Sequence, residues 1–181
     1  MDICIVFNDG INEGSMNLLK TEIETALAQN PTRIKLWFTT NGGEIHAALD
    51  FYDWITSNNF PIDIIGFNKI KSSGLIVFLA FESRFFKNKA EFLFHQVYID
   101  EAKRSATTSD EKMKEFNDRM FEVIKSTINL PDIVYSTLLT YHIDVIIKDV
   151  TELQDFGIGS LTADVINIPV VIESGTVMRP R

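Results

Sequence analysis

The chain has 181 residues, of which 45% are hydrophobic and 23% charged, which is the composition of an ordinary globular protein. Its formal net charge of −8 and the lack of a basic stripe argue against a nucleic-acid partner, because phosphate binding requires clustered Lys and Arg. The longest apolar run, Leu75–Phe81, is too short to cross a bilayer and no secretory signal is recognisable, so a cytoplasmic location without membrane attachment is expected.

The first apolar run, Ile3–Phe7, predicts a buried strand. The single cysteine, Cys4, lies inside this run and is expected to be a core thiol, since it has no partner for an internal disulfide. A helix with apolar residues at helical spacing follows. Ser15 is the candidate N-cap of this helix, and Asn30-Pro31 ends it.

Strands are next predicted over residues 34–38 and 62–67, with an amphipathic helix over residues 45–55 between them. The resulting β-α-β-α-β order indicates an α/β fold with a mainly parallel sheet. We expect residues 1–181 to form one domain, with an extended tail over residues 167–181.

Two polar segments stand where strands of this sheet would end. Asn41-Gly42-Gly43 follows the second strand, and Ser72 follows the third. Ligands of parallel α/β sheets bind at the carboxyl ends of the strands. Glycine permits close approach of backbone N–H groups to an oxyanion, and a serine hydroxyl beside them is suited to acyl transfer.

After Ser72 the chain is expected to contain a helix that is apolar on every side, two short strands, and three further helices. The expected positions are residues 74–81 for the apolar helix, 84–86 and 92–95 for the strands, and starts near Ser109, Pro131 and Asp149 for the helices, the last ending at Gly157. His95 lies in the second of these strands, and Asp144 follows downstream. Ser72, His95 and Asp144 are therefore a candidate catalytic triad, whereas no residue cluster has metal-ligand spacing. No metal and no cofactor is expected.

These segments together resemble the ClpP family of serine peptidases, within the ClpP/crotonase-like superfamily. The family carries a glycine-pair turn, a Tyr-Asp dipeptide in the next helix, a serine nucleophile before glycine, and a His-Gln pair. The matching positions here are Asn41-Gly42-Gly43, Tyr52-Asp53, Ser72-Ser73-Gly74 and His95-Gln96, and residues 151–158 resemble the segment that follows the family's aspartate. No gap is needed from the glycine pair to the serine.

The resemblance implies that Ser72 is the nucleophile and His95 the general base. It also implies that the backbone N–H groups of Gly43 and Ser73 form the oxyanion hole. For the third member, an ungapped count back from Gly157 reaches Tyr141 and His142, neither of which is a carboxylate. A small gap brings Asp144 into place, and Asp144 is our choice, because Asp149 reads more readily as a helix cap.

Several positions depart from the family pattern. Lys71 precedes the nucleophile, Ser73 replaces a methionine, Val97 replaces a proline, and Tyr98–Ala102 stands where the family has a glycine-rich strand that holds peptide. The chain also begins almost directly at its first strand, so the segment through which the family engages its ATPase is not among the expected features, and an ATPase partner is left open.

The leading hypothesis is a ClpP-like serine endopeptidase acting on peptides or unfolded proteins. The resemblance implies a closed homo-oligomer of stacked rings built on the long helix. One alternative is a catalytically impaired ClpP-like subunit with a structural or binding role. A crotonase-type acyl-CoA enzyme is disfavoured, because it does not need Ser72 and His95 together. A Ser–Lys dyad would require a distant lysine that the sequence does not place.

Overall fold

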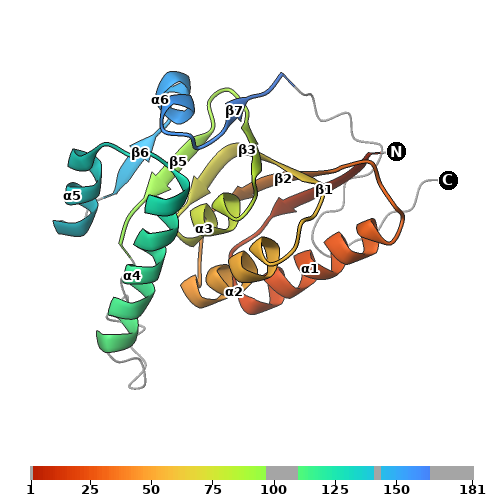
Figure 1. The fold of residues 1–181 in the computed structure, drawn as a ribbon, viewed down its shortest axis with the longest axis horizontal. Coiled ribbons are helices and arrows are strands. Elements are labelled where there is room, and N and C mark those ends of the chain that lie inside the picture. The colour runs from red at the N-terminus through yellow and green to blue at the C-terminus, as the bar shows by residue number, and fades with distance from the viewer. Residues whose placement is uncertain (1, 97–109, 141–143, 164–181) are drawn as a thin grey trace.

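The computed structural model describes residues 2–96, 110–140 and 144–163. Within these ranges the chain forms a seven-stranded sheet with helices packed against it (Figure 1). The expected tail over residues 167–181 and the segment Tyr98–Ala102 lie outside the described residues. In chain order the elements are β1 (Ile3–Asn8), α1 (Glu13–Leu27), β2 (Ile34–Thr40), α2 (Ile45–Thr56), β3 (Ile62–Lys71), α3 (Ser73–Leu79), β4 (Ser83–Phe86), β5 (Glu91–Phe94), α4 (Asp110–Thr127), α5 (Asp132–Thr140), β6 (Val145–Ile147), α6 (Val150–Asp155) and β7 (Ser160–Leu161).

The sheet is mainly parallel, which confirms the α/β prediction. Its main path runs in the order β1-β2-β3-β4-β7, and all of these neighbours are parallel. The exception is β6, which pairs with β5 in the antiparallel direction. Parallel neighbours end at the same edge of a sheet, so the turns that follow β1, β2, β3 and β5 gather on one side of the molecule.

Strand β3 changes partners part-way along its length. Residues 63–66 pair with β4, whereas residues 69–71 pair with β5. The change occurs at a bulge opposite Thr39, where Asn68 adopts a φ of 56°. The hydroxyl of Thr39 holds this bulge by donating to the Lys69 carbonyl, at 3.0 Å. The bulge lets β5 approach the last residues of β3, immediately before Ser72.

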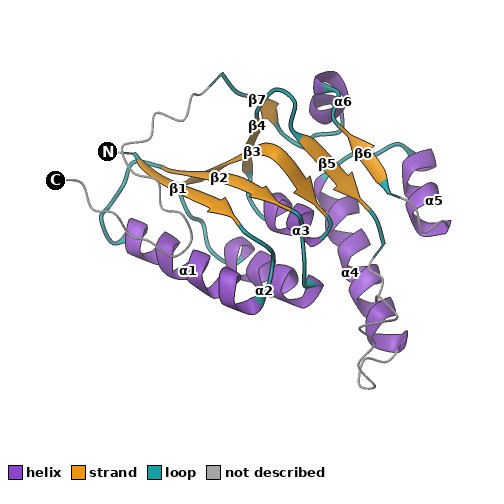
Figure 2. Ribbon diagram, turned by 180° about the vertical axis from the view of Figure 1, so that it is seen from behind, coloured by secondary structure: helices purple, strands orange, loops and turns teal. Residues whose placement is uncertain are grey.

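Helices α1 to α4 cover one face of the sheet (Figure 2). All residues of α3 are buried, as its apolar sequence predicts, because α3 packs between the sheet and the neighbouring helices. Helix α1 begins three residues earlier than a Ser15 N-cap would give. Asn12 is the N-cap, and Ser15 accepts a hydrogen bond from the Asn12 backbone N–H as the second member of a capping box.

Cys4 is half-buried rather than enclosed in the core. It lies on β1, at the edge of the sheet, and its side chain alternates with those of Ile5 and Phe7, which face the core. Burial still raises the pKa of the Cys4 thiol, which keeps it mainly in the unreactive thiol form at neutral pH.

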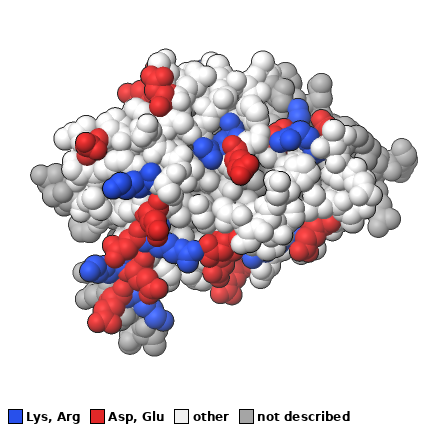
Figure 3. All heavy atoms as spheres, viewed as in Figure 1, with Lys and Arg blue, Asp and Glu red and all other residues white. Residues whose placement is uncertain are grey.

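Helix α4 extends beyond the body of the molecule (Figure 1). It is fastened to α2 by an ion pair between Arg119 and Asp53. Figure 3 shows Lys and Arg side chains beside Asp and Glu along this projecting helix. None of the described helices is both long enough and apolar enough to cross a membrane.

The last strands, β6 and β7, are too short for their sequences to predict. The guanidinium of Arg84 holds this part of the chain to the sheet. It donates to the carbonyls of Gly157 and Ile158, at 3.0 Å each, and to that of Phe81 at 2.7 Å. Gly157, with φ 72°, ends α6 as predicted.

The close approach of α3 to β2 requires glycine at position 74. A Cβ at Gly74 would lie 2.2 Å from Cγ2 of Thr40, a side chain whose hydroxyl is held by two hydrogen bonds. We therefore expect Gly74→Ala to lower the free energy of unfolding by about 1–3 kcal/mol, the usual cost of overpacking, although alanine is the better helix former. Urea denaturation measures this change. Gly10→Ala is the control, since its Cβ would meet only Gly42 O at 3.7 Å. A Gly74→Ala protein as stable as the wild type would contradict this packing.

Candidate active site

The predicted site residues stand on adjacent strand ends. Lys71 pairs with Leu93 in the parallel β3–β5 ladder, so Ser72 lies one step beyond this pair, and its N–H donates to the Leu93 carbonyl at 3.0 Å. Phe94 pairs with Val145 in the antiparallel β5–β6 ladder. His95 follows Phe94 and Asp144 precedes Val145, so both residues adjoin the last pair of this ladder. The sheet thus brings the glycine turn, Ser72, His95 and Asp144 into one row along its edge.

Ser72 has an unusual backbone conformation, with φ 54° and ψ −129°. L-residues other than glycine rarely adopt a positive φ, and such strain is typical of functional sites. Ser72 joins the end of β3 to the start of α3, and its hydroxyl does not cap the helix. The side chain is half-buried. This strand–turn–helix geometry presents a serine at the tip of a sharp turn, as in nucleophile elbows.

The glycine turn lies directly against Ser72. A Cβ on Gly42 would be 2.7 Å from the Cβ of Ser72 and 2.6 Å from the Lys71 carbonyl oxygen, so no other residue fits there. Gly43 forms a parallel bridge with Ile11, in which Ile11 bonds to the carbonyl of Gly42 and to the N–H of Glu44. The N–H of Gly43 itself therefore points away from Ile11. Gly43 is exposed and can meet a ligand.

Thr40 holds the glycine turn in place. Its hydroxyl donates to the Asp9 carbonyl at 2.7 Å and accepts from the Gly42 N–H at 3.0 Å. The Thr40 residue is buried, with 3% of its surface exposed. It therefore links the end of β1, the end of β2 and the glycine turn by two hydrogen bonds shielded from water.

Ser73 is the first residue of α3, where a backbone N–H has no acceptor within the helix. Its side chain is buried, and its hydroxyl has no partner among the described residues. The side chain of Ser73 therefore cannot reach a substrate, whereas its N–H stands beside the Ser72 side chain. The predicted role of Ser73 in an oxyanion hole uses only this N–H.

His95 is half-buried directly after β5. Its Nδ1 lies 2.6 Å from the backbone carbonyl oxygen of Gln96. A carbonyl can only accept a hydrogen bond, so this contact assigns a proton to Nδ1, and in the neutral imidazole the lone pair is then on Nε2. This is the tautomer that a general base requires.

Asp144 does not contact His95 through its side chain. The Asp144 side chain is exposed, and no hydrogen bond or ion pair joins it to the imidazole among the described residues. Tyr141 and His142 lie outside the described residues. Asp149 is the N-cap of α6, accepting from the N–H groups of Thr151 and Glu152, as its sequence context predicts.

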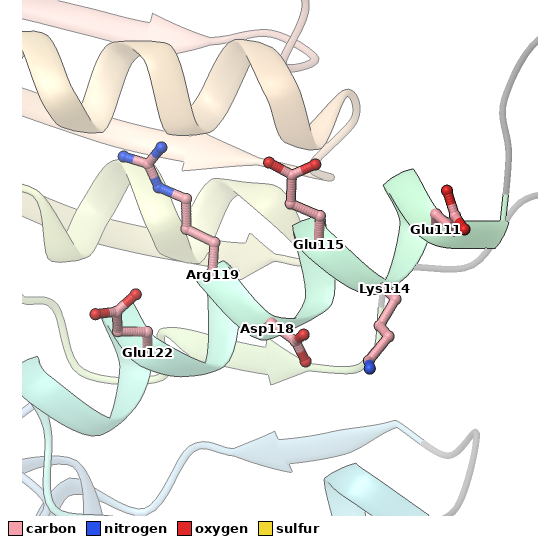
Figure 4. A pocket seen from close by; sticks show the side chains of 6 residues that line it. All are labelled: Glu111, Lys114, Glu115, Asp118, Arg119 and Glu122. Carbon is pink, nitrogen blue, oxygen red and sulfur yellow. The ribbon is translucent and has the colours of Figure 1, made fainter.

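Charged side chains also occur outside the predicted site residues. His46 is on α2 and is close to Glu13 and Glu44, at 3.4 and 3.5 Å. A hollow on the surface is lined by charged side chains of α4 alone, and they point outward from the helix (Figure 4). Among the residues the structure describes, no group of three or more His, Cys, Asp or Glu side chains could hold a metal ion.

One protein-family model matches most of this chain. The Clp protease model matches residues 2–133. The chain belongs to the Clp protease family. Among solved structures, this Clp protease domain is similar to a point mutant of ClpP1 from Listeria monocytogenes, with a TM-score of 0.72 and 17% identity over 89% of this chain and 91% of that chain. That likeness confirms the fold. None of the curated proteins matches the chain.

Two residues of the site escape prediction from the sequence. Thr40 is an ordinary strand residue in the sequence, and only its position before the glycine pair marks it. Gln96 belongs to the His-Gln pair, but its side chain contacts Leu138 and Leu139 of α5, which are 42 and 43 residues further along the chain. Sequence spacing cannot reveal such a contact.

The strain at Ser72 has a measurable consequence for stability. We expect Ser72→Gly to be more stable than Ser72→Ala by about 1 kcal/mol or more, because glycine accepts a positive φ and alanine does not. Chemical denaturation of the two proteins gives the difference, independently of any activity.

The control pair is Ser57→Gly and Ser57→Ala, at an exposed residue with φ −78°. There the order should reverse, because alanine restricts the unfolded chain. Equal stability of the two Ser72 variants would show that the turn carries no strain.

Proposed function

We propose that this Clp protease domain is a serine endopeptidase that cleaves peptide bonds through an acyl-enzyme on Ser72. The observation that carries the proposal is the positive φ of Ser72 at the junction of β3 and α3, beside the glycine turn. A strained serine whose hydroxyl does not cap its helix is arranged for reaction rather than for stability.

In the proposed reaction, Oγ of Ser72 attacks the carbonyl carbon of the scissile bond while Nε2 of His95 takes the hydroxyl proton. The tetrahedral intermediate collapses when the C–N bond breaks, and the imidazolium returns this proton to the leaving amine. A water molecule, deprotonated by the same imidazole, then hydrolyses the ester. The Nδ1 hydrogen bond to the Gln96 carbonyl supports this role, since it leaves Nε2 as the basic nitrogen.

The N–H groups of Gly43 and Ser73 are the proposed oxyanion hole. Two observations support them: the bridge to Ile11 leaves the Gly43 N–H pointing to the opposite side, and the Ser73 N–H has no acceptor within α3. Each such donor stabilises the charge that develops in the transition state, and the loss of one typically lowers the rate by about 10²–10³. Asp144, at the same end of the β5–β6 ladder as His95, is the proposed carboxylate of the triad, and its exposure to water limits it to a weak stabilisation of the imidazolium.

The second candidate is a Clp-family subunit without efficient catalysis. The observation that favours it is the exposed Asp144 carboxylate, which makes no hydrogen bond to His95 in the described part of the chain. Such a subunit would retain the fold and the assembly of the family and would serve a structural or binding role.

A fluorophosphonate probe distinguishes these two candidates. In the assembled wild-type protein we expect a covalent adduct on Ser72, located by mass spectrometry of its peptide. Both Ser72→Ala and His95→Ala should abolish it, because one removes the nucleophile and the other the base that activates it. Ser73→Ala is the matched control: it removes the neighbouring hydroxyl, which is buried, and keeps the N–H.

Labelling that survives in Ser72→Ala, or a wild-type oligomer that is not labelled, would refute the proposed mechanism. The second of these results favours the impaired subunit. For a labelled protein, hydrolysis of unstructured fluorogenic peptides then tests the endopeptidase activity directly.

We further propose a homo-oligomer that encloses the active sites and admits unfolded chains or short peptides. The projecting α4 and the exposed apolar side chains Ile133 and Leu139 of α5 and Ile146 of β6, which are 72%, 57% and 52% exposed, support such contacts. Native mass spectrometry should give a multiple of the 20.6 kDa chain. Ile133→Glu should weaken the assembly, whereas Leu18→Glu on α1 should not; a monomeric wild-type protein would contradict the proposal.

A further inference from the structure

Gln96 makes two kinds of contact at once. Its side-chain amide nitrogen Nε2 donates to the carbonyls of Leu138 and Leu139 in α5, at 2.6 and 2.8 Å. Its backbone carbonyl accepts the hydrogen bond from Nδ1 of His95, at 2.6 Å. A single residue therefore connects the end of a helix to the nitrogen that sets the tautomer of the proposed base.

The end of α5 is suited to receive this side chain. The last four carbonyls of a helix have no donor within it and carry partial negative charge. Helix α5 ends at Thr140, so Leu138 and Leu139 lie in its last turn. The primary amide of glutamine has two N–H donors and can satisfy both carbonyls, whereas a glutamate at the same position would have no proton to donate at neutral pH.

We propose that Gln96 is the positioning residue for His95. Its amide anchors the segment after β5 to α5, and this anchorage holds the Gln96 carbonyl at Nδ1. The inference rests on the proposed serine peptidase function and names the residue that fixes the base in it. Among the residues that the structure describes, the group at Nδ1 of His95 is a backbone carbonyl, and we assign to it the orienting task that a triad gives to a carboxylate.

The two tasks of a triad carboxylate are thereby divided. One is to fix the tautomer, and the other is to stabilise the imidazolium with a negative charge. A neutral carbonyl performs only the first. Asp144 is solvent-exposed, and an exposed charge adds little to the stability of an ion pair because water screens it. Its contribution to the second task is consequently small.

Two variants of Gln96 test the anchorage. Gln96→Glu keeps the shape, removes both donors and adds charge, while Gln96→Met keeps the length without donors or charge. Gln29→Glu is the matched control, because Gln29 also donates to a helix carbonyl, that of Thr25 at 3.3 Å, but lies at the end of α1. Asp144→Asn completes the set.

The decisive readout is the tautomer of His95, measured by solid-state NMR of sedimented protein labelled with ¹⁵N-histidine. The chain has three histidines, and His95→Ala assigns the signal. We expect protonated Nδ1 in the wild type, Gln29→Glu and Asp144→Asn, and a mixture of tautomers in both Gln96 variants. This readout does not depend on activity, so it separates failure of the inference from failure of the proposed function.

The rate of fluorophosphonate labelling is the second readout. Both Gln96 variants should be labelled about 10–100-fold more slowly, by analogy with the loss of the outer partner that orients a metal-binding histidine. Asp144→Asn should slow labelling at most about fivefold. An altered tautomer in Asp144→Asn, or an unaltered one in both Gln96 variants, would overturn the proposal.

Discussion

The arrangement of this edge of the molecule depends on Thr40. Its hydroxyl joins the end of β1 to the glycine turn, and its methyl group contacts the place where α3 crosses the strand ends. Only glycine at position 74 permits that crossing. The contact between Thr40 and Gly74 therefore sets the distance of α3 from β2, and with it the position of Ser72 at the start of α3. The hydrogen bond from the Gly42 N–H to Thr40 sets the direction in which Gly43 presents its N–H.

The strain at Ser72 is tolerated because its neighbours leave the backbone no alternative. Its N–H donates to the Leu93 carbonyl, and Gly42 lies so close to its Cβ that a side chain on Gly42 would not fit. The buried helix α3 fixes the chain immediately after it. Proteins keep such strain where the surroundings over-determine it. A serine held in this way needs little reorganisation before it attacks a carbonyl, and that is the advantage a proposed nucleophile gains from an unfavourable conformation.

The fold is largely predictable from the sequence because it depends on local patterns. The apolar runs of β1 to β3, the glycine pair and the all-apolar α3 each reveal their structure over a few residues. The N-cap of α1 is Asn12 and not the predicted Ser15. Both residue types are good N-caps, and only the hydrogen bonds of the capping box show which of the two holds the N-cap position. Strands β6 and β7 are too short to give a pattern in the sequence and are defined only by their pairing with β5 and β4. The contact of Gln96 with α5 and the exposure of Asp144 depend on where distant segments meet, and no local pattern encodes that.

The change of partners along β3 divides the sheet into two hydrogen-bonded units that share one strand. Ser72 lies where the two units meet, because the glycine turn contacts it from one side and its N–H is bound to Leu93 of β5 on the other. His95 follows β5, which is joined to β3 by only three paired residues. Segments with few pairings open more often than the whole domain unfolds. Local opening of β5 and β6 would therefore move the imidazole and release the N–H of Ser72 in the same event, so the proposed nucleophile and base would lose their arrangement together.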